Sequence, residues 1–144
     1  MRSENERMLT HVMVVMLLQS AVTHDEIAAD LSVRGIFLFL LQTTHHDERA
    51  AFIIRTPCGG FTFVSWPMSD DANSVAWRGA YPPGTVAIVH THPNWLPMPS
   101  RVDMRSAAAA HLPIYVITQR HVTKTDGVAS KIVLDGEWAP TLAG

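Results

Sequence analysis

The stretch that decides the fold runs from Val86 to Met104 and has the sequence VAIVHTHPNWLPMPSRVDM. Residues 86–89 form an apolar run that is typical of a buried strand, and His90 and His92 follow at its end. Side chains alternate across a strand, so residues two apart share a face and Thr91 between them points the other way. The sequence therefore predicts a strand that ends with two imidazoles on one side.

Prolines and alanines determine the structure expected after this strand. Prolines at 93, 97 and 99 predict a stiff loop over residues 93–99, because proline cannot donate to a sheet ladder or continue a helix. Ser100 then opens the alanine-rich segment 101–110, which is a strong helix former. Asp103 lies one turn into that predicted helix. Two imidazoles and one carboxylate can therefore converge on a single point.

The order of these residues resembles the motif of the JAMM zinc metalloproteases, also called MPN-plus or JAB-domain proteins. The match consists of His90, His92, Pro93, Ser100 and Asp103, with seven residues between the second histidine and the serine. The resemblance implies one Zn²⁺ ion per chain, with His90, His92 and Asp103 as metal ligands and a water in the fourth position. It also implies that Ser100 is catalytic and donates a hydrogen bond to the oxyanion.

A simpler interpretation exists for part of this motif. Ser100 followed by Asp103 is also a capping box, in which the two side chains satisfy the first amides of a helix. Capping explains both residues without a metal, but it does not account for the two histidines. We therefore favour a metal site over a degenerate copy of the motif that binds none.

The resemblance also requires a glutamate upstream that acts as general acid and base, and Glu26 and Glu48 are the candidates. The family places this glutamate at the start of a strand, and Glu48 stands just before the strand-like run 50–55 (AAFIIR). Glu26 is already explained as an acid in the first turn of a helix capped by Thr23 or Asp25. We predict that Glu48 is the catalytic glutamate; the alternative is a solvated surface charge.

Composition narrows the class of protein. The chain has 144 residues, 47% of them hydrophobic and 17% charged, with a formal net charge of -2. One domain is expected from this length, and nucleic acid is not an expected partner because no basic stripe is present. The single cysteine, Cys58, cannot form an internal disulfide, which favours a reducing, cytoplasmic compartment. A cysteine protease built on Cys58 is an alternative, but no local pattern pairs it with a histidine.

The apolar run at residues 8–18 is too short to cross a bilayer, which needs about 20 residues. Arg2 and Arg7 precede it, as in a secretory signal peptide, whereas Glu4 and Glu6 dilute that positive charge. We favour an amphipathic or buried helix here and keep secretion through a signal peptide as the alternative.

The rest of the chain predicts an α/β (α+β) single domain with a mixed, mostly antiparallel sheet flanked by helices, which agrees with the JAB/MPN (cytidine-deaminase-like) architecture. An N-terminal helical segment, 1–46, precedes the predicted metalloprotease core, 47–138. The predicted elements are a helix from about 23 to 31, a buried helix end or strand over 36–41, a hairpin over 50–66, and strands over 113–118 and 131–134. Residues 67–84 are expected to form a long loop, and Trp77 and Tyr81 on it are expected to contact a ligand or to cap the core.

The function implied by the resemblance is hydrolysis of a peptide or isopeptide bond. The substrate is then a protein or peptide, with a ubiquitin-like protein among the candidates. Trp95, Leu96 and Met98 would give the site an apolar rim for an extended tail. Two alternatives remain: a catalytically silent scaffold that binds a partner protein, and another metal-dependent hydrolase on the same fold.

Overall fold

The computed structural model describes residues 23–44, 48–67, 79–92, 96–136 and 138–139. These residues form helices α2 (Glu26–Ala29), α3 (Leu31–Thr43) and α4 (Arg101–Ala110), and strands β1 (Ala50–Arg55), β2 (Phe61–Ser65), β3 (Thr85–Thr91), β4 (Ile114–Ile117), β5 (His121–Thr125) and β6 (Ser130–Asp135). The apolar run 8–18, which we interpret as a helix or as part of a signal peptide, lies outside the described residues. Across the described part of the chain, no helix has the length and apolar character needed to cross a membrane.

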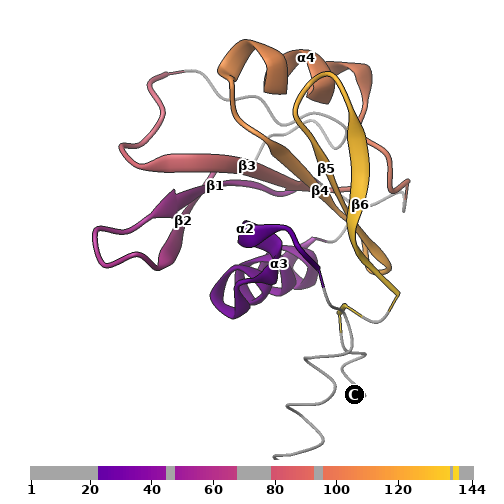
Figure 1. Cartoon of the computed structure of the whole chain (residues 1–144), viewed down its shortest axis with the longest axis horizontal. Helices are drawn as coiled ribbons and strands as arrows, with labels where there is room; N and C mark the ends of the chain where they lie inside the picture. Colours follow the sequence, from indigo (N-terminus) through magenta and orange to yellow (C-terminus); the bar gives the residue numbers. More distant parts are fainter. Residues whose placement is uncertain (1–22, 45–47, 68–78, 93–95, 137, 140–144) are drawn as a thin grey trace, which may run out of the picture.

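The strands form one sheet in the order β2-β1-β3-β4-β5-β6. Neighbouring strands are antiparallel except β3 and β4, which are parallel. Parallel neighbours need a crossover connection, and α4 supplies it. Figure 1 shows α2 and α3 on one side of the sheet and α4 on the other. The predicted α+β domain with a mixed, mostly antiparallel sheet is confirmed.

The N-terminal helices differ from the prediction in one respect. The helix expected over 23–31 stops at Asp30, whose backbone is extended and whose side chain accepts hydrogen bonds from the next amides along the chain. An aspartate that bonds these amides competes with continuation of the preceding helix and caps a new one. Asp30 therefore separates α2 from α3. Residues 36–41, whose sequence is compatible with either the end of a helix or a strand, lie in α3.

Strand β5 is absent from the predicted set, so five strands were expected where the structure has six. Its sequence, HVTKT, is short and mostly polar, and such a segment carries little hydrophobic signal. Nevertheless Thr123 and Thr125 are fully buried. Antiparallel pairing with both β4 and β6 makes this segment a strand, and that pairing is a property of the tertiary structure.

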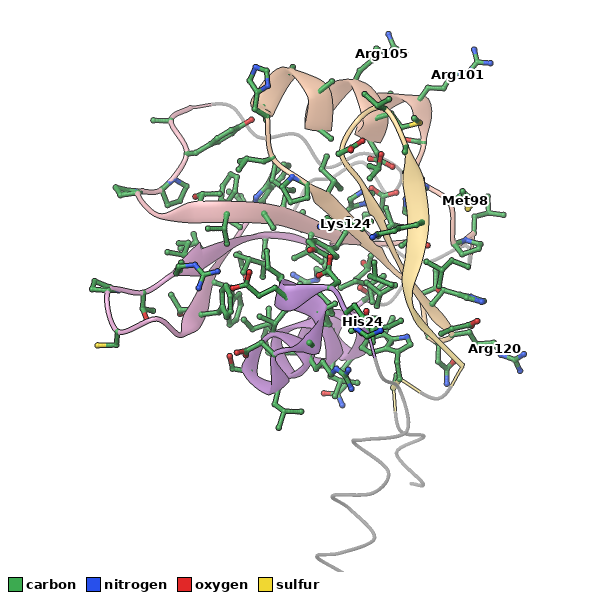
Figure 2. All side chains as sticks on the ribbon, in the orientation of Figure 1. His24, Met98, Arg101, Arg105, Arg120 and Lys124 are labelled. Atoms are coloured by element: carbon green, nitrogen blue, oxygen red, sulfur yellow. The ribbon has the colours of Figure 1, made fainter. Side chains whose placement is uncertain are left out.

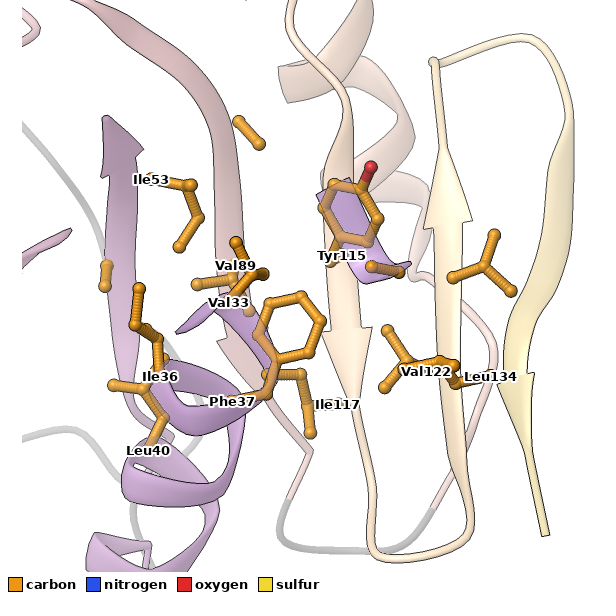
Figure 3. Packing of buried hydrophobic residues seen from close by; sticks show 14 of the residues in the cluster. Val33, Ile36, Phe37, Leu40, Ile53, Val89, Tyr115, Ile117, Val122 and Leu134 are labelled. Carbon is orange, nitrogen blue, oxygen red and sulfur yellow. The ribbon is translucent and has the colours of Figure 1, made fainter. Parts of the chain in front are cut away.

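The larger core cluster lies between α3 and the sheet (Figure 3). Val33, Phe37 and Leu40 recur at helical spacing along α3 and are fully or almost fully buried. Their partners on the sheet include Ile53, Val89, Tyr115, Ile117, Val122 and Leu134. Burial of one such large side chain stabilises the fold by about 1.5–3 kcal/mol. Because Val89 belongs to this face, His90 points to the opposite one.

Helix α4 lies on that opposite face of the sheet (Figure 1). The smaller apolar cluster on this face contains Phe52, Ile88, Ala107, Ile114 and Val116. Ala107 is the one residue of α4 that is buried, and its methyl group fills little space. The side chains of this cluster are nevertheless buried, with 0–4% exposure.

Asp25 links the N-terminal helices to the sheet. Its side chain is only 4% exposed. It accepts hydrogen bonds from the amide of Ala28 at 2.9 Å, the hydroxyl of Tyr115 at 2.8 Å and Nζ of Lys124 at 2.8 Å. Asp25, one of the two residues predicted to cap this helix, therefore caps α2. It also anchors the start of the helix to β4 and β5.

We expect Asp25→Ala to lower the free energy of unfolding by about 2–4 kcal/mol. The substitution removes a helix cap and leaves two donors, Tyr115 and Lys124, without their shared acceptor. Urea denaturation of the purified variant measures the loss. Asp30→Ala is the matched control, because it removes only a cap and should cost about 1 kcal/mol. Equal losses in the two variants would contradict the anchoring role.

The same carboxylate makes stability depend on pH. Burial raises the pKa of Asp25, but the hydrogen bonds from Ala28, Lys124 and Tyr115 outweigh it, so the pKa lies below its ordinary 3.8. The unfolded chain then binds more protons in acid than the folded one. The stabilisation is complete above the ordinary pKa and is lost as the pH falls through the lowered one. Asp25→Asn should lack this part of the acid sensitivity.

Candidate metal centre

Two histidines emerge where the central strand β3 ends. β3 is held on both sides, by β1 and by β4, and the amide of His92 still donates to the carbonyl of Ile117 at 3.0 Å. The rings of His90 and His92 lie with their centroids 4.8 Å apart. Both side chains are largely buried. The fold therefore places two imidazoles side by side on a rigid support, as the alternation predicts.

Helix α4 brings Asp103 to these histidines. Its Oδ1 lies 2.9 Å from Nε2 of His90, and its Oδ2 lies 3.7 Å from Nε2 of His92. The capping box is also present: Ser100 Oγ accepts from the Asp103 amide at 3.1 Å, and Asp103 Oδ2 accepts from the Ser100 amide at 2.6 Å. The two interpretations of Ser100 and Asp103 are therefore compatible, because the capping box orients the same carboxylate that meets both imidazoles.

Glu48 reaches the cluster from the start of β1. Its Oε2 lies 3.9 Å from Nδ1 of His90. The neighbouring Arg49 is fixed to β3, since its amide donates to Thr91 Oγ1 at 3.0 Å and its carbonyl accepts from the Thr91 amide at 2.8 Å. Thr91, which faces away from the histidines as predicted, thus holds the chain segment that carries Glu48.

The protonation of one imidazole is set by its surroundings. Nδ1 of His92 lies 2.8 Å from the carbonyl oxygen of Leu96, which can only accept a hydrogen bond, so Nδ1 carries the proton. Nε2 of His92 is then the nitrogen with the lone pair, and it faces Asp103. A backbone carbonyl that orients a histidine in this way is usual behind a metal ligand. No sequence pattern points to the carbonyl of Leu96.

The charges at this site suit metal binding. Burial raises the pKa of Asp103, but the neighbouring imidazole of His90 and hydrogen bonds with Ser100 outweigh it and bring the pKa to about 2. Burial lowers the pKa of His92, and the charge of His90 lowers it further, against smaller opposing effects of Leu96 and Asp103. Metals bind the carboxylate and the neutral imidazole, which are the forms that these shifts favour in Asp103 and in His92.

The donor set fits zinc, which prefers imidazole nitrogen and carboxylate oxygen. Glu48, His90 and His92 each offer a ligand atom within 4.8 Å of the others, so a metal could be held by this group. Nε2 of His90 is buried and, although close to Asp103, makes no well-directed hydrogen bond. A cation between the imidazoles and a carboxylate would satisfy this atom.

The remaining predicted positions lie around this centre. Ser100 is exposed, and a hydroxyl that accepts one hydrogen bond can still donate its own proton. Leu96 and Met98 are exposed on the loop before α4, whereas Trp95 lies outside the described residues, as does Trp77. Cys58 is exposed on the β1–β2 turn, at the other end of β1 from Glu48.

A pocket of about 260 Å³ opens beside the cluster. Glu48, His90 and Asp103 form part of its wall, and Trp66, Tyr81 and Val102 belong to the rest. Tyr81 was one of two loop aromatics expected to contact a ligand or the core. Trp66 and Val102 were not identified from the sequence, because a residue at a strand end and a valine on a helix carry no signal of a shared cavity.

Comparison with known proteins gives a family match. The model of the family described as prokaryotic homologs of the JAB domain matches residues 31–131, well over half of the chain. No curated protein and no solved structure matches the chain.

Proposed function

The chain belongs to the prokaryotic homologs of the JAB domain, and on that basis we propose that it is a zinc-dependent hydrolase that cleaves a peptide or isopeptide bond. The single observation that carries the proposal is the position of Asp103, whose two oxygens approach Nε2 of His90 and Nε2 of His92. His90 at the end of β3, His92 just after it and Asp103 of α4 are thereby brought close together, and a catalytic zinc site uses three protein ligands and a water.

Two carboxylates approach His90, and their positions support different roles. Asp103 faces Nε2, the side shared with His92, whereas Glu48 faces Nδ1. We therefore propose His90, His92 and Asp103 as the ligands and Glu48 as the general acid and base. A bound zinc ion would lower the pKa of a water towards about 7 and polarise the substrate carbonyl.

Glu48 would accept a proton from the attacking water and pass it to the leaving amine, so that water oxygen bonds the carbonyl carbon as the C–N bond breaks. The fixed contact between Arg49 and Thr91 keeps the chain beside this carboxylate in one place. Ser100 would donate a hydrogen bond from its hydroxyl to the oxyanion, an interaction that strengthens as negative charge develops.

The substrate of such an enzyme is a protein or peptide, and a ubiquitin-like protein is one candidate. Leu96 and Met98 expose apolar side chains between His92 and α4 in the sequence, and they would contact an extended segment of that substrate. The single cysteine of the chain is consistent with action in a reducing, cytoplasmic compartment.

The proposal is tested by hydrolysis of a mixed peptide library. Zinc-loaded protein should cleave peptides, protein treated with a chelator should not, and added zinc should restore the activity. Cleavage that persists without metal would contradict the proposal. Absence of cleavage of peptides and isopeptide-linked conjugates by the zinc-loaded protein would favour the protein-binding scaffold.

A further inference from the structure

The pocket beside the metal centre has an apolar wall that the hydrolytic chemistry does not use. Ile88 and Ile114 are buried residues of the sheet, and Ala50, Trp66, Tyr81 and Val102 also belong to this wall. The same cavity includes Glu48, His90 and Asp103. A group seated against the apolar wall is therefore adjacent to the atoms that would carry out hydrolysis.

A buried phenylalanine packs against both aromatic residues of this wall. Phe52, which is fully buried in β1, lies with its ring centroid 5.2 Å from that of Trp66 and 5.3 Å from that of Tyr81. Both contacts are tilted, a favourable arrangement for aromatic pairs. Two rings supported by one buried phenylalanine form a preformed surface, and a preformed site loses little entropy when a ligand binds.

Charge limits what the pocket can accept. Among the described residues, its lining holds the carboxylates of Glu48 and Asp103 and no lysine or arginine. Figure 2 shows Arg101 and Arg105 of α4 pointing away from the sheet, and both are exposed. An acidic side chain seated against the apolar wall would lose its hydration and lie near these two carboxylates.

The volume of the pocket and its position beside Glu48 indicate which part of a substrate it holds. A pocket of about 260 Å³ is smaller than the roughly 300–1,000 Å³ of typical small-ligand sites, so it suits a single side chain. The lining includes Glu48, which would protonate the leaving amine, but not Ser100, which would face the oxyanion. The pocket therefore lies on the side of the leaving amine.

We infer that this pocket selects substrates with an apolar side chain on the residue that comes directly after the cleaved bond. The inference rests on the hydrolase proposed above, because the direction of the substrate is set by the role of Glu48. The occupant is an aliphatic or aromatic residue whose α-amine is the leaving group. Residues with a carboxylate at this position are disfavoured, because the apolar wall cannot replace the hydration of the charge.

Val102 permits a test that spares the core. Its side chain is 65% exposed on the first turn of α4, so Val102→Lys adds a cation to the pocket without removing a buried group. Leu31→Lys is the matched control, since Leu31 is 63% exposed and also lies in the first turn of a helix, α3, on the other face of the sheet. Zinc content and thermal denaturation establish that both variants are folded.

The zinc-loaded proteins are incubated with a peptide library, and mass spectrometry identifies the residue after each cleaved bond. The wild type and Leu31→Lys should prefer apolar residues there. Val102→Lys should lower the ratio of apolar to acidic residues by roughly tenfold or more, because the ammonium attracts an acidic side chain and disturbs an apolar contact, and a single methylene contact alone is worth about 10–200-fold. If Val102→Lys does not fold, Tyr81→Ala, which opens the wall, should shift the preference towards larger side chains.

Direct binding separates the two proposals. Leucine amide and aspartate amide, which carry the leaving amine and one side chain, are titrated into the zinc-loaded wild type by heteronuclear NMR. Binding of leucine amide without any cleavage would preserve the pocket and overturn the hydrolase. Cleavage without any preference for the residue after the bond would overturn the pocket and preserve the hydrolase. A preference that neither Val102→Lys nor Tyr81→Ala changes would have the same consequence. Neither cleavage nor binding would overturn both.

Discussion

Replacing Glu48 with glutamine is expected to lower the turnover number by about 10²–10⁴-fold, the usual contribution of a positioned general base, with no loss of zinc. Glutamine keeps the shape of the side chain but cannot accept the proton from water. The Glu48 side chain is 19% exposed and lies beside His90, so an isosteric substitution should preserve the surrounding contacts. Turnover is measured on a peptide that the zinc-loaded wild type cleaves, together with zinc content by elemental analysis.

Glu26 provides the matched control, because it is the other glutamate that the sequence offers. Its side chain is 78% exposed and forms an ion pair with Arg55 at 2.9 Å. Arg55 ends β1, whereas Glu48 lies two residues before its first residue, so the two residues are separated by roughly 23 Å of extended chain at about 3.3 Å per residue. Glu26→Gln should therefore leave turnover unchanged. Full turnover in Glu48→Gln would assign the general base to another group.

Zinc is expected at about one ion per chain in the wild type and at background level in His90→Ala and Asp103→Ala. Each substitution removes one of the three proposed ligands, and Asp103 is the group that approaches both imidazoles. Elemental analysis after dialysis at neutral pH gives the stoichiometry. A wild type that takes up no zinc even when the metal is supplied would contradict the metal centre.

Two further variants show whether a lost ligand or a disturbed fold causes the loss of zinc. His24→Ala removes an exposed histidine that precedes the helices and should keep the ion. Ser100→Ala removes the hydroxyl that caps α4, at a cost of about 1 kcal/mol, but leaves the Asp103 carboxylate in place. It should also retain zinc. If Ser100→Ala loses zinc as completely as Asp103→Ala, a disordered helix start accounts for the result.

Local patterns in the sequence were sufficient for several features of the fold. Alternation along β3 placed His90 and His92 on one face, and the serine and aspartate at the start of α4 form the predicted capping box. The hairpin of β1 and β2 and the helix over Arg101–Ala110 occur where turn residues and alanines predicted them. Each of these features depends on residues within a few positions of one another. The catalytic and ligand roles that the family motif implies stay predictions.

Contacts between distant segments were decided only by the tertiary structure. β5 is a strand because β4 and β6 pair with it, and its own sequence is too polar to show this. Glu48 approaches His90 because β1 pairs with β3 and Thr91 binds Arg49 across the two strands. A motif can name residues that belong together, but only packing determines the distances between their atoms.

The pocket illustrates the same distinction most clearly. Trp66, Tyr81 and Val102 come from a strand end, a loop and a helix, and no spacing in the sequence relates them. The sequence by itself determined the family, the α+β architecture and a candidate set of site residues, because short-range periodicity and motif spacing encode these. The tertiary structure decided how those residues meet and what lies next to them, because a cavity exists only where separate elements fail to fill the space between them.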